Sequence, residues 1–189
     1  MWALVTDNTI TKIINNPKAL VIGDTQYSKN IFSFRWSNEE REAIGLYEVV
    51  FDNTNKKDEA YYTNTNQSFA FAGGVVTASY GSANAKALAD VTNEDDSISP
   101  GLKTQHKDTI KQQASSLLAT YDWYVIRKAD AGTAVPSAVT TYRAAVRTKS
   151  GEMETLIDNA ANVDALAALY VYNNDDPRVR PLGEFPEAV

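Results

Sequence analysis

The spacing of apolar residues changes once along this chain, and the change restricts the folds that the chain can adopt. Residues 1 to about 83 hold short runs of β-branched and aromatic residues between turn formers, a pattern typical of β-strands. From residue 102 a mainly apolar stripe recurs at helical spacing: Leu102, His106, Ile110, Ala114, Leu117 and Leu118. Because strands precede helices without alternating with them, we predict an α+β fold. It has an antiparallel β-rich N-terminal domain followed by a helical C-terminal region, a hairpin or small bundle.

Local signals predict the turns and one helix boundary of the β-rich part. Asp7-Asn8 and Gly73-Gly74 each separate two apolar runs, and both pairs tolerate the positive φ angles of two-residue hairpin turns. Ser37 stands three residues before Glu40, the spacing of a capping box, and Gly45 suits the end of the same short helix. Residues 47–52 alternate in polarity as a half-buried strand does.

Composition divides the chain into four segments. We predict a β-rich domain over residues 1–92, an acidic linker over 93–101, a helical region over 102–172 and an extended arm over 173–189. Residues 84–90 are expected to form a short helix. A break near Thr120-Tyr121 separates two later helices and Pro136 starts the next one, which Ser150-Gly151 either interrupts or splits in two.

Bulk properties exclude several classes of partner. The net charge of −6 argues against binding to nucleic acid, which needs Lys and Arg to neutralise phosphates. The chain has no cysteine and a single histidine, so thiolate and multi-histidine metal sites within one chain are excluded. A signal peptide and an apolar run of ~18 residues are both absent. We therefore expect synthesis in the cytoplasm and no membrane insertion.

The sequence shows no constellation typical of an enzyme. Gly73-Gly74 lies between two strands rather than before a helix, which indicates a turn and not a phosphate cradle. The carboxylate pairs at Glu39-Glu40, 94–96 and Asp175-Asp176 fall in a cap, a linker and a turn, where they lack the burial that tunes a catalytic acid. We expect His106 to be a hydrogen-bonded boundary residue rather than a base. We predict no catalytic residue, no metal and no cofactor.

Seven residues of the C-terminal half are candidates for contact with another protein: Trp123, Arg127, Tyr142, Arg143, Arg147, Arg178 and Arg180. Arginine with aromatic residues is typical of interface hot spots, although Trp123 and Tyr142 equally suit the core between two antiparallel helices, and the two roles can coexist. Arg143 and Arg147 share one helix face, which indicates acidic neighbours within the chain or across an interface.

The arm over residues 173–189 is polar and carries three prolines, Pro177, Pro181 and Pro186. Ordering it costs about 1–2 kcal/mol of backbone entropy per residue, so we expect disorder unless another chain binds it. A second hypothesis places a glycan on the β-rich domain, with Tyr61, Tyr62 and Tyr80 as the stacking residues.

Two stretches carry a resemblance to known proteins. Asp122-Trp123-Tyr124-Val125-Ile126-Arg127, followed by Pro136 and by Tyr142-Arg143-Ala144-Ala145-Val146-Arg147, resembles the C-terminal segment of tail-fibre-assembly and related tail proteins of tailed bacteriophages. Met1-Trp2-Ala3, with Ile14-Asn15-Asn16-Pro17-Lys18 close behind, is similar to the start of small tail-associated proteins of marine phages.

The resemblance implies a non-enzymatic virion component, a tail or baseplate protein or a tail-fibre adaptor, made in the host cytoplasm and then located in the tail. The implied partners are other tail or fibre proteins, and the implied state is a homo-oligomer within a symmetric assembly. The alternatives are a tail-fibre assembly chaperone absent from the virion and a glycan- or receptor-binding module.

Overall fold

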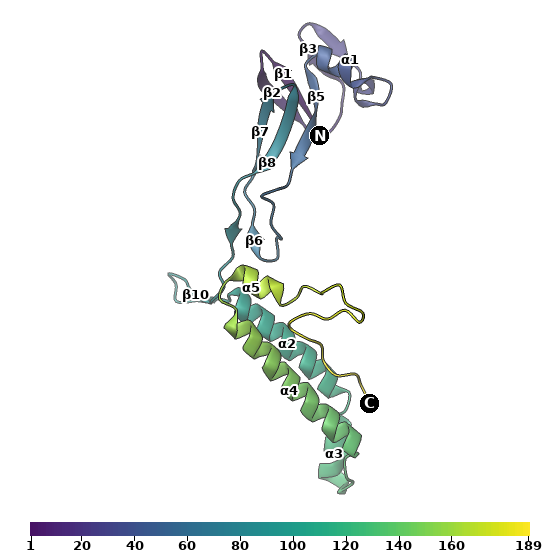
Figure 1. The fold of residues 1–189 in the computed structure, drawn as a ribbon, viewed down its shortest axis with the longest axis vertical. Coiled ribbons are helices and arrows are strands. Elements are labelled where there is room, and N and C mark those ends of the chain that lie inside the picture. Colours follow the sequence, from purple (N-terminus) through teal and green to yellow (C-terminus); the bar gives the residue numbers. More distant parts are fainter. The chain divides into compact units, whose positions relative to one another are not determined.

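The computed structural model describes residues 1–189 and divides into two compact units, Met1–Asn84 and Ala85–Val189 (Figure 1). The first unit is β-rich and the second is mainly helical, which confirms the predicted α+β class. The division falls between Asn84 and Ala85 and not within the acidic segment 93–101, where the composition had placed it.

A five-stranded sheet with the order β2-β1-β5-β8-β7 forms the first unit. Its strands are β1 (Trp2–Thr6), β2 (Thr9–Ile14), β5 (Leu46–Asp52), β7 (Gln67–Ala72) and β8 (Val75–Tyr80). The sheet curls until its two edges, β2 and β7, approach each other (Figure 1). Apolar side chains inside the curl form one core cluster: Ala3, Val5, Val49, Val76 and Ala78.

One strand pair departs from the predicted antiparallel arrangement. β8 runs parallel to β5, with Val49 opposite Val76, whereas the pairs β1–β2, β1–β5 and β7–β8 are antiparallel. After β5 the chain reverses direction and forms β7, which does not pair with β5 but leaves room for one strand between them. The β7–β8 hairpin places β8 in that position. Because β8 is antiparallel to β7, and β7 runs opposite to β5, β8 runs in the same direction as β5. The order of strands in space therefore decides the orientation, and the pattern of residues does not encode it.

The predicted turns of this unit are confirmed. Asp7 and Asn8 have φ angles of 51° and 59°, and Gly73 and Gly74 have 58° and 79°. Gly45 has a φ of 77°, and a Cβ atom there would lie 2.4 Å from the Val5 carbonyl oxygen, so glycine is required both for the conformation and for the contact. Residues 47–52 differ from the predicted alternation, because Val50 and Phe51 are both about half exposed.

Two further short strands of the chain are β6 (Tyr62–Thr63) and β9 (Asn84–Ala85). Small elements also lie at one end of the sheet (Figure 1): β3 (Leu20–Ile22), β4 (Thr25–Tyr27), the 3₁₀ helix η1 (Lys29–Phe32) and α1 (Asn38–Ala43). The predicted capping box starts α1, since the Glu40 N–H donates to the Ser37 hydroxyl and the Ser37 N–H donates to the Glu40 carboxylate. A second core cluster, built on Ile14, Ile31 and Leu46, lies beneath these elements.

Four helices form most of the second unit: α2 (Leu102–Ala119), α3 (Asp122–Ala131), α4 (Ser137–Asn159) and α5 (Val163–Ala168). Lys107 is paired with Asp158 and Lys111 with Glu154, so α2 and α4 are antiparallel neighbours (Figure 1). The break near Thr120 and the start after Pro136 are as predicted. α4 continues through Ser150 and Gly151, where a side chain would meet open space.

The predicted helix over residues 84–90 does not form. Residues 87–90 instead cap the start of α2: the Leu102 and Lys103 N–H groups donate to the carbonyls of Ala87 and Leu88, and the Gly101 N–H donates to the Asp90 carboxylate. The first N–H groups of a helix have no acceptor within the helix, and residues 87–90 supply acceptors for those at the start of α2. Hydrogen bonds from Thr104 first and Gly101 second lower the pKa of Asp90.

The acidic segment and the C-terminal arm are both structured. The segment expected as a linker, residues 93–101, lies largely in a small hairpin between β10 (Val91–Thr92) and β11 (Ile98–Ser99). The arm expected to be extended folds back on the helices: Leu182 is fully buried, its N–H donates to the Leu169 carbonyl, and Phe185 packs on the α2–α4 core. Burial of Leu182 and partial burial of Phe185 offset part of the entropy cost that the composition indicated, and hydrogen bonds to the helical unit add to them.

Candidate functional site

Tyr142 belongs to the core of the helical unit. Its side chain lies on α4 among Ala114, Tyr121, Val139 and Val146. The ring of Tyr121 meets the ring of Tyr142 edge-on, with 5.2 Å between centroids. Of the two roles open to Tyr142, the structure places it in packing.

Arg143 is engaged inside the helical unit. One guanidinium nitrogen lies 2.7 Å from the Leu118 carbonyl oxygen at the end of α2 and 2.8 Å from the Asp122 carboxylate at the start of α3. Arg143 therefore joins two helix ends. Its positive charge is stabilised by the C-terminal end of α2, and the negative charge of Asp122 is stabilised by the N-terminal end of α3. Asp122 is the acidic neighbour that the Arg143/Arg147 pair indicated. Arg147 itself is exposed and donates to the Arg143 carbonyl.

Helix α3 buries none of its ten residues. The Arg127 guanidinium lies over the rings of Trp123 and Tyr124, at 4.7 and 5.3 Å from their centroids. Three large side chains of α3 remain exposed: Trp123 is 49% exposed, Val125 45% and Ile126 66%. Trp123 and Ile126 lie three positions apart and therefore share one side of the helix, which we call the α3 face. Val125, two positions from Trp123, points away from this face.

Arg180 stabilises the fold of the arm. Its guanidinium lies over the rings of Tyr170 and Tyr172, at 5.7 and 5.4 Å, and forms an ion pair of 2.7 Å with Glu184. Stacking and the ion pair leave little of Arg180 for another chain. Arg178, the other candidate of the arm, is exposed.

His106 lies against Tyr170, with 2.7 Å between Nδ1 and the phenolic oxygen, as a hydrogen-bonded boundary residue would. Burial lowers the pKa of His106 below its ordinary value of 6.5. When the pKa of a histidine is lower in the folded protein than in the unfolded chain, protonation favours the unfolded chain. The stability of the fold is therefore greatest above the pKa of the unfolded chain, where the histidine is neutral in both states. It decreases as the pH falls from that pKa toward the pKa of the folded protein.

We expect the melting temperature of the wild type to fall more than that of His106→Gln between about pH 7.5 and about pH 5.5. The comparison removes the effects of carboxylates, which both proteins share, and glutamine keeps a polar partner for Tyr170. Thermal melts followed by circular dichroism measure it. Equal losses in the two proteins would show that His106 carries no pH-dependent stability.

The tyrosines proposed to stack on a glycan, Tyr61, Tyr62 and Tyr80, are partly buried. Lys57 lies 5.7 Å from the ring centroid of Tyr62, and Lys56 lies 5.8 Å from that of Tyr80. Burial, followed by the nearby Asp58 carboxylate, raises the pKa of Tyr61. A lysine thus lies over one face of the Tyr62 ring and of the Tyr80 ring, and the glycan hypothesis stays a prediction.

Two carboxylates from the acidic pairs, those of Glu40 and Asp95, serve local structure. Glu40 completes the α1 capping box, and Asp95 accepts hydrogen bonds from the backbone and hydroxyl of Ser97. No group of three or more His, Cys, Asp or Glu side chains is arranged to hold a metal ion. None of the helices combines the length and the apolar character that crossing a bilayer requires.

The sequence singled out Trp123 on α3 but not the exposed Val125 and Ile126, although a signal for their exposure is present. Trp123, Tyr124, Val125 and Ile126 are consecutive, and successive residues of a helix point about 100° apart. Four consecutive large side chains therefore cannot all face one core, and some of them must be exposed.

Comparisons with protein-family models, with curated proteins and with solved structures find no match to this chain.

Proposed function

We propose that this protein is a non-enzymatic component of a larger assembly that acts through protein–protein contacts, with the α3 face as one contact surface. The observation that carries the proposal is the exposure of Trp123 and Ile126, which share one face of a helix that buries no residue. Full burial of such a side chain stabilises by roughly 1.5–3 kcal/mol, and about half of that remains available at each position. Exposed apolar patches of this kind mark interaction sites.

The resemblance of Asp122–Arg127 and Tyr142–Arg147 to tail proteins supports a narrower proposal. In it the chain is a tail or baseplate component, or a tail-fibre adaptor, of a tailed phage, located in the virion and bound to other tail or fibre proteins. Arg143 and Tyr142 would then preserve the helix ends that present α3, rather than contact the partner. Trp123, Ile126 and Arg147 are members of these stretches that remain exposed to a partner.

The exposed face also suits a chaperone that covers an apolar surface of a fibre only during assembly. Mass spectrometry of the purified particle separates the two roles. An adaptor is present in a copy number that matches the symmetry of the tail, whereas a chaperone is absent from the particle but bound to the fibre protein before assembly.

Ile126→Asp is expected to reduce recovery of the bound tail or fibre protein at least ~10-fold, because it places a charge in an apolar contact. Ile98→Asp is the matched control, since Ile98 is 65% exposed, Ile126 is 66% exposed, and both belong to the helical unit. Quantitative co-purification from infected cells measures the effect. Equal recovery with the two variants would show that the α3 face is not the contact.

A further inference from the structure

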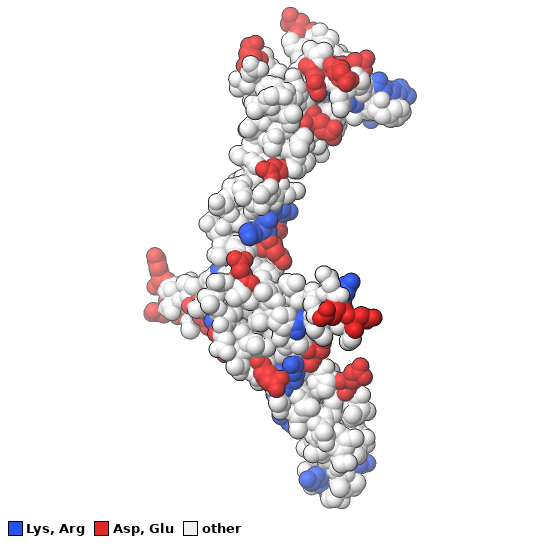
Figure 2. Space-filling model, in the orientation of Figure 1, with Lys and Arg blue, Asp and Glu red and all other residues white.

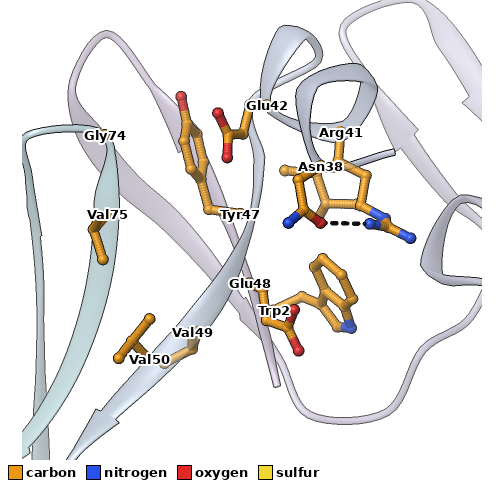
Figure 3. Close-up of a pocket in the computed structure, with 11 residues that line it drawn as sticks. Trp2, Asn38, Arg41, Glu42, Tyr47, Glu48, Val49, Val50, Gly74 and Val75 are labelled. Carbon is orange, nitrogen blue, oxygen red and sulfur yellow. Dashed lines mark hydrogen bonds between the residues drawn. The ribbon is translucent and has the colours of Figure 1, made fainter. Parts of the chain in front are cut away.

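A groove of about 270 Å³ lies beside β5 in the β-rich unit (Figure 3). α1 contributes Glu42, β5 contributes Glu48 and Val50, and β8 contributes Val75 (Figure 3). Small-molecule sites typically have volumes of about 300–1,000 Å³, so this groove suits one or two protein side chains better than a whole ligand.

The groove combines apolar and acidic surface. Val50 and Val75 are 54% and 44% exposed, and neither Glu42 nor Glu48 takes part in any of the ion pairs of the chain. Arg41 also borders it, but its guanidinium is committed to the Ile31 and Ser33 carbonyls and to the Asn38 side chain. With two carboxylates against one arginine, the lining keeps a net negative charge. An occupant with an apolar group next to a cation fits it.

The same unit exposes such a pair. Phe34 is 94% exposed, the highest value of any large apolar side chain in the chain, and the exposed Arg35 follows it directly. Lys29, at the start of η1, is also exposed. Figure 2 shows basic atoms gathered on a protruding loop near α1, with acidic atoms over the neighbouring elements.

The loop that carries Phe34 is held in place. The Ser33 hydroxyl donates to the Asn30 carbonyl at 2.7 Å, the Trp36 N–H donates to the Ser33 carbonyl at 3.2 Å, and the buried Arg41 holds the Ser33 carbonyl from inside. A side chain presented by a rigid loop loses little entropy on binding. Phe34 is thus a preorganised anchor without a partner inside its own chain.

We propose that Phe34 and Arg35 of one copy occupy the groove of a second copy, with the ring against Val50 and Val75 and the guanidinium beside Glu42 and Glu48. The donor and acceptor surfaces are different patches of the same chain, so the contact is head-to-tail. Repetition of such a contact produces a ring where the rotation closes and a filament where it does not. The contact lies on the β-rich unit and is separate from the α3 face.

Sedimentation of the full chain over a range of concentrations tests the contact. The wild type is expected to self-associate, and Phe34→Ala is expected to raise the dissociation constant of self-association at least ~10-fold. Phe51→Ala, at the other exposed phenylalanine of the unit, is the matched control and is expected to associate as the wild type does. Wild-type protein that stays monomeric up to its solubility limit would refute the proposal, as would unchanged association of Phe34→Ala.

A charge exchange tests the pairing of the two surfaces. Arg35→Glu and Glu48→Arg should each associate weakly alone, because like charges then meet in the groove. Their equimolar mixture should recover association. The glutamate at position 35 of the first variant can pair with the arginine at position 48 of the second. Arg35 of the second variant can pair with the unchanged Glu48 of the first. A mixture that stays as weak as its components would overturn the pairing. Ile126→Asp should leave self-association unchanged, so this inference and the proposed α3 contact fail independently.

Discussion

Arg41→Ala is expected to lower the free energy of unfolding of the β-rich unit by roughly 3 kcal/mol. Arg41 is 6% exposed, donates to the Ile31 and Ser33 carbonyls and to Asn38, and lies 4.9 Å from the centroid of the Trp2 ring. Its removal leaves the buried Ile31 carbonyl without this donor, opens a cavity beside Trp2 and frees the loop between η1 and α1.

Denaturant unfolding followed by tryptophan fluorescence measures this effect. The chain has three tryptophans, and a Trp123→Phe background restricts the signal to Trp2 and Trp36 of the β-rich unit. Arg35→Ala is the control, because Arg35 is exposed and its replacement should change the free energy by less than about 0.5 kcal/mol. Arg41→Lys should recover little of the loss, since an ammonium group cannot reproduce the planar fork of donors. A loss with Arg41→Ala no greater than that with Arg35→Ala would contradict the structural role.

Leu182→Ala is expected to destabilise the helical unit by about 3 kcal/mol, within the range of 2–5 that such core truncations cost. Leu182 is fully buried although it lies in a segment that the composition marks as an arm. Deletion of residues 178–189 should cost more, because it also removes Phe185 from the α2–α4 core and the Val189 carbonyl that accepts from the Tyr121 hydroxyl.

Far-UV circular dichroism during thermal and urea unfolding follows the helices in these variants. Val179→Ala serves as the control in the same segment, since Val179 is 53% exposed and its truncation should be nearly neutral. The β-rich unit should remain folded in the deletion variant. If the deletion leaves helix content and stability unchanged, the arm is a free tail, as its composition alone indicated.

These two residues illustrate what tertiary structure adds. An arginine four residues after a helix cap is ordinarily on the surface, and only the position of the η1 loop above α1 buries Arg41 and turns it into a donor for backbone carbonyls. Leu182 is one apolar residue among prolines and charges, and only the hydrogen bond between its N–H and the Leu169 carbonyl shows where it is held.

The candidate contact residues show the same limit. The sequence indicated that Trp123, Arg127, Tyr142, Arg143 and Arg147 lie on neighbouring helices, but it left core and surface roles open. The structure buries Tyr142, commits Arg143 to Leu118 and Asp122, and leaves Trp123 half exposed. To assign each residue to the core or to the surface, one must know how each helix is rotated about its own axis relative to its neighbour. The spacing of apolar residues by three and four positions does not specify that rotation.

The sequence by itself determined the features that depend on a few adjacent residues. The turns at Asp7-Asn8 and Gly73-Gly74, the capping box from Ser37 to Glu40 and the start of α4 after Pro136 follow from side-chain chemistry within a single turn of chain. Only the tertiary structure decided that β8 lies parallel to β5, that residues 87–90 cap α2 instead of forming a helix, and that residues 182–185 pack on the helical core. Each of these depends on a contact between distant segments. Its stability comes from burial and hydrogen bonds that exist only once both partners are in place.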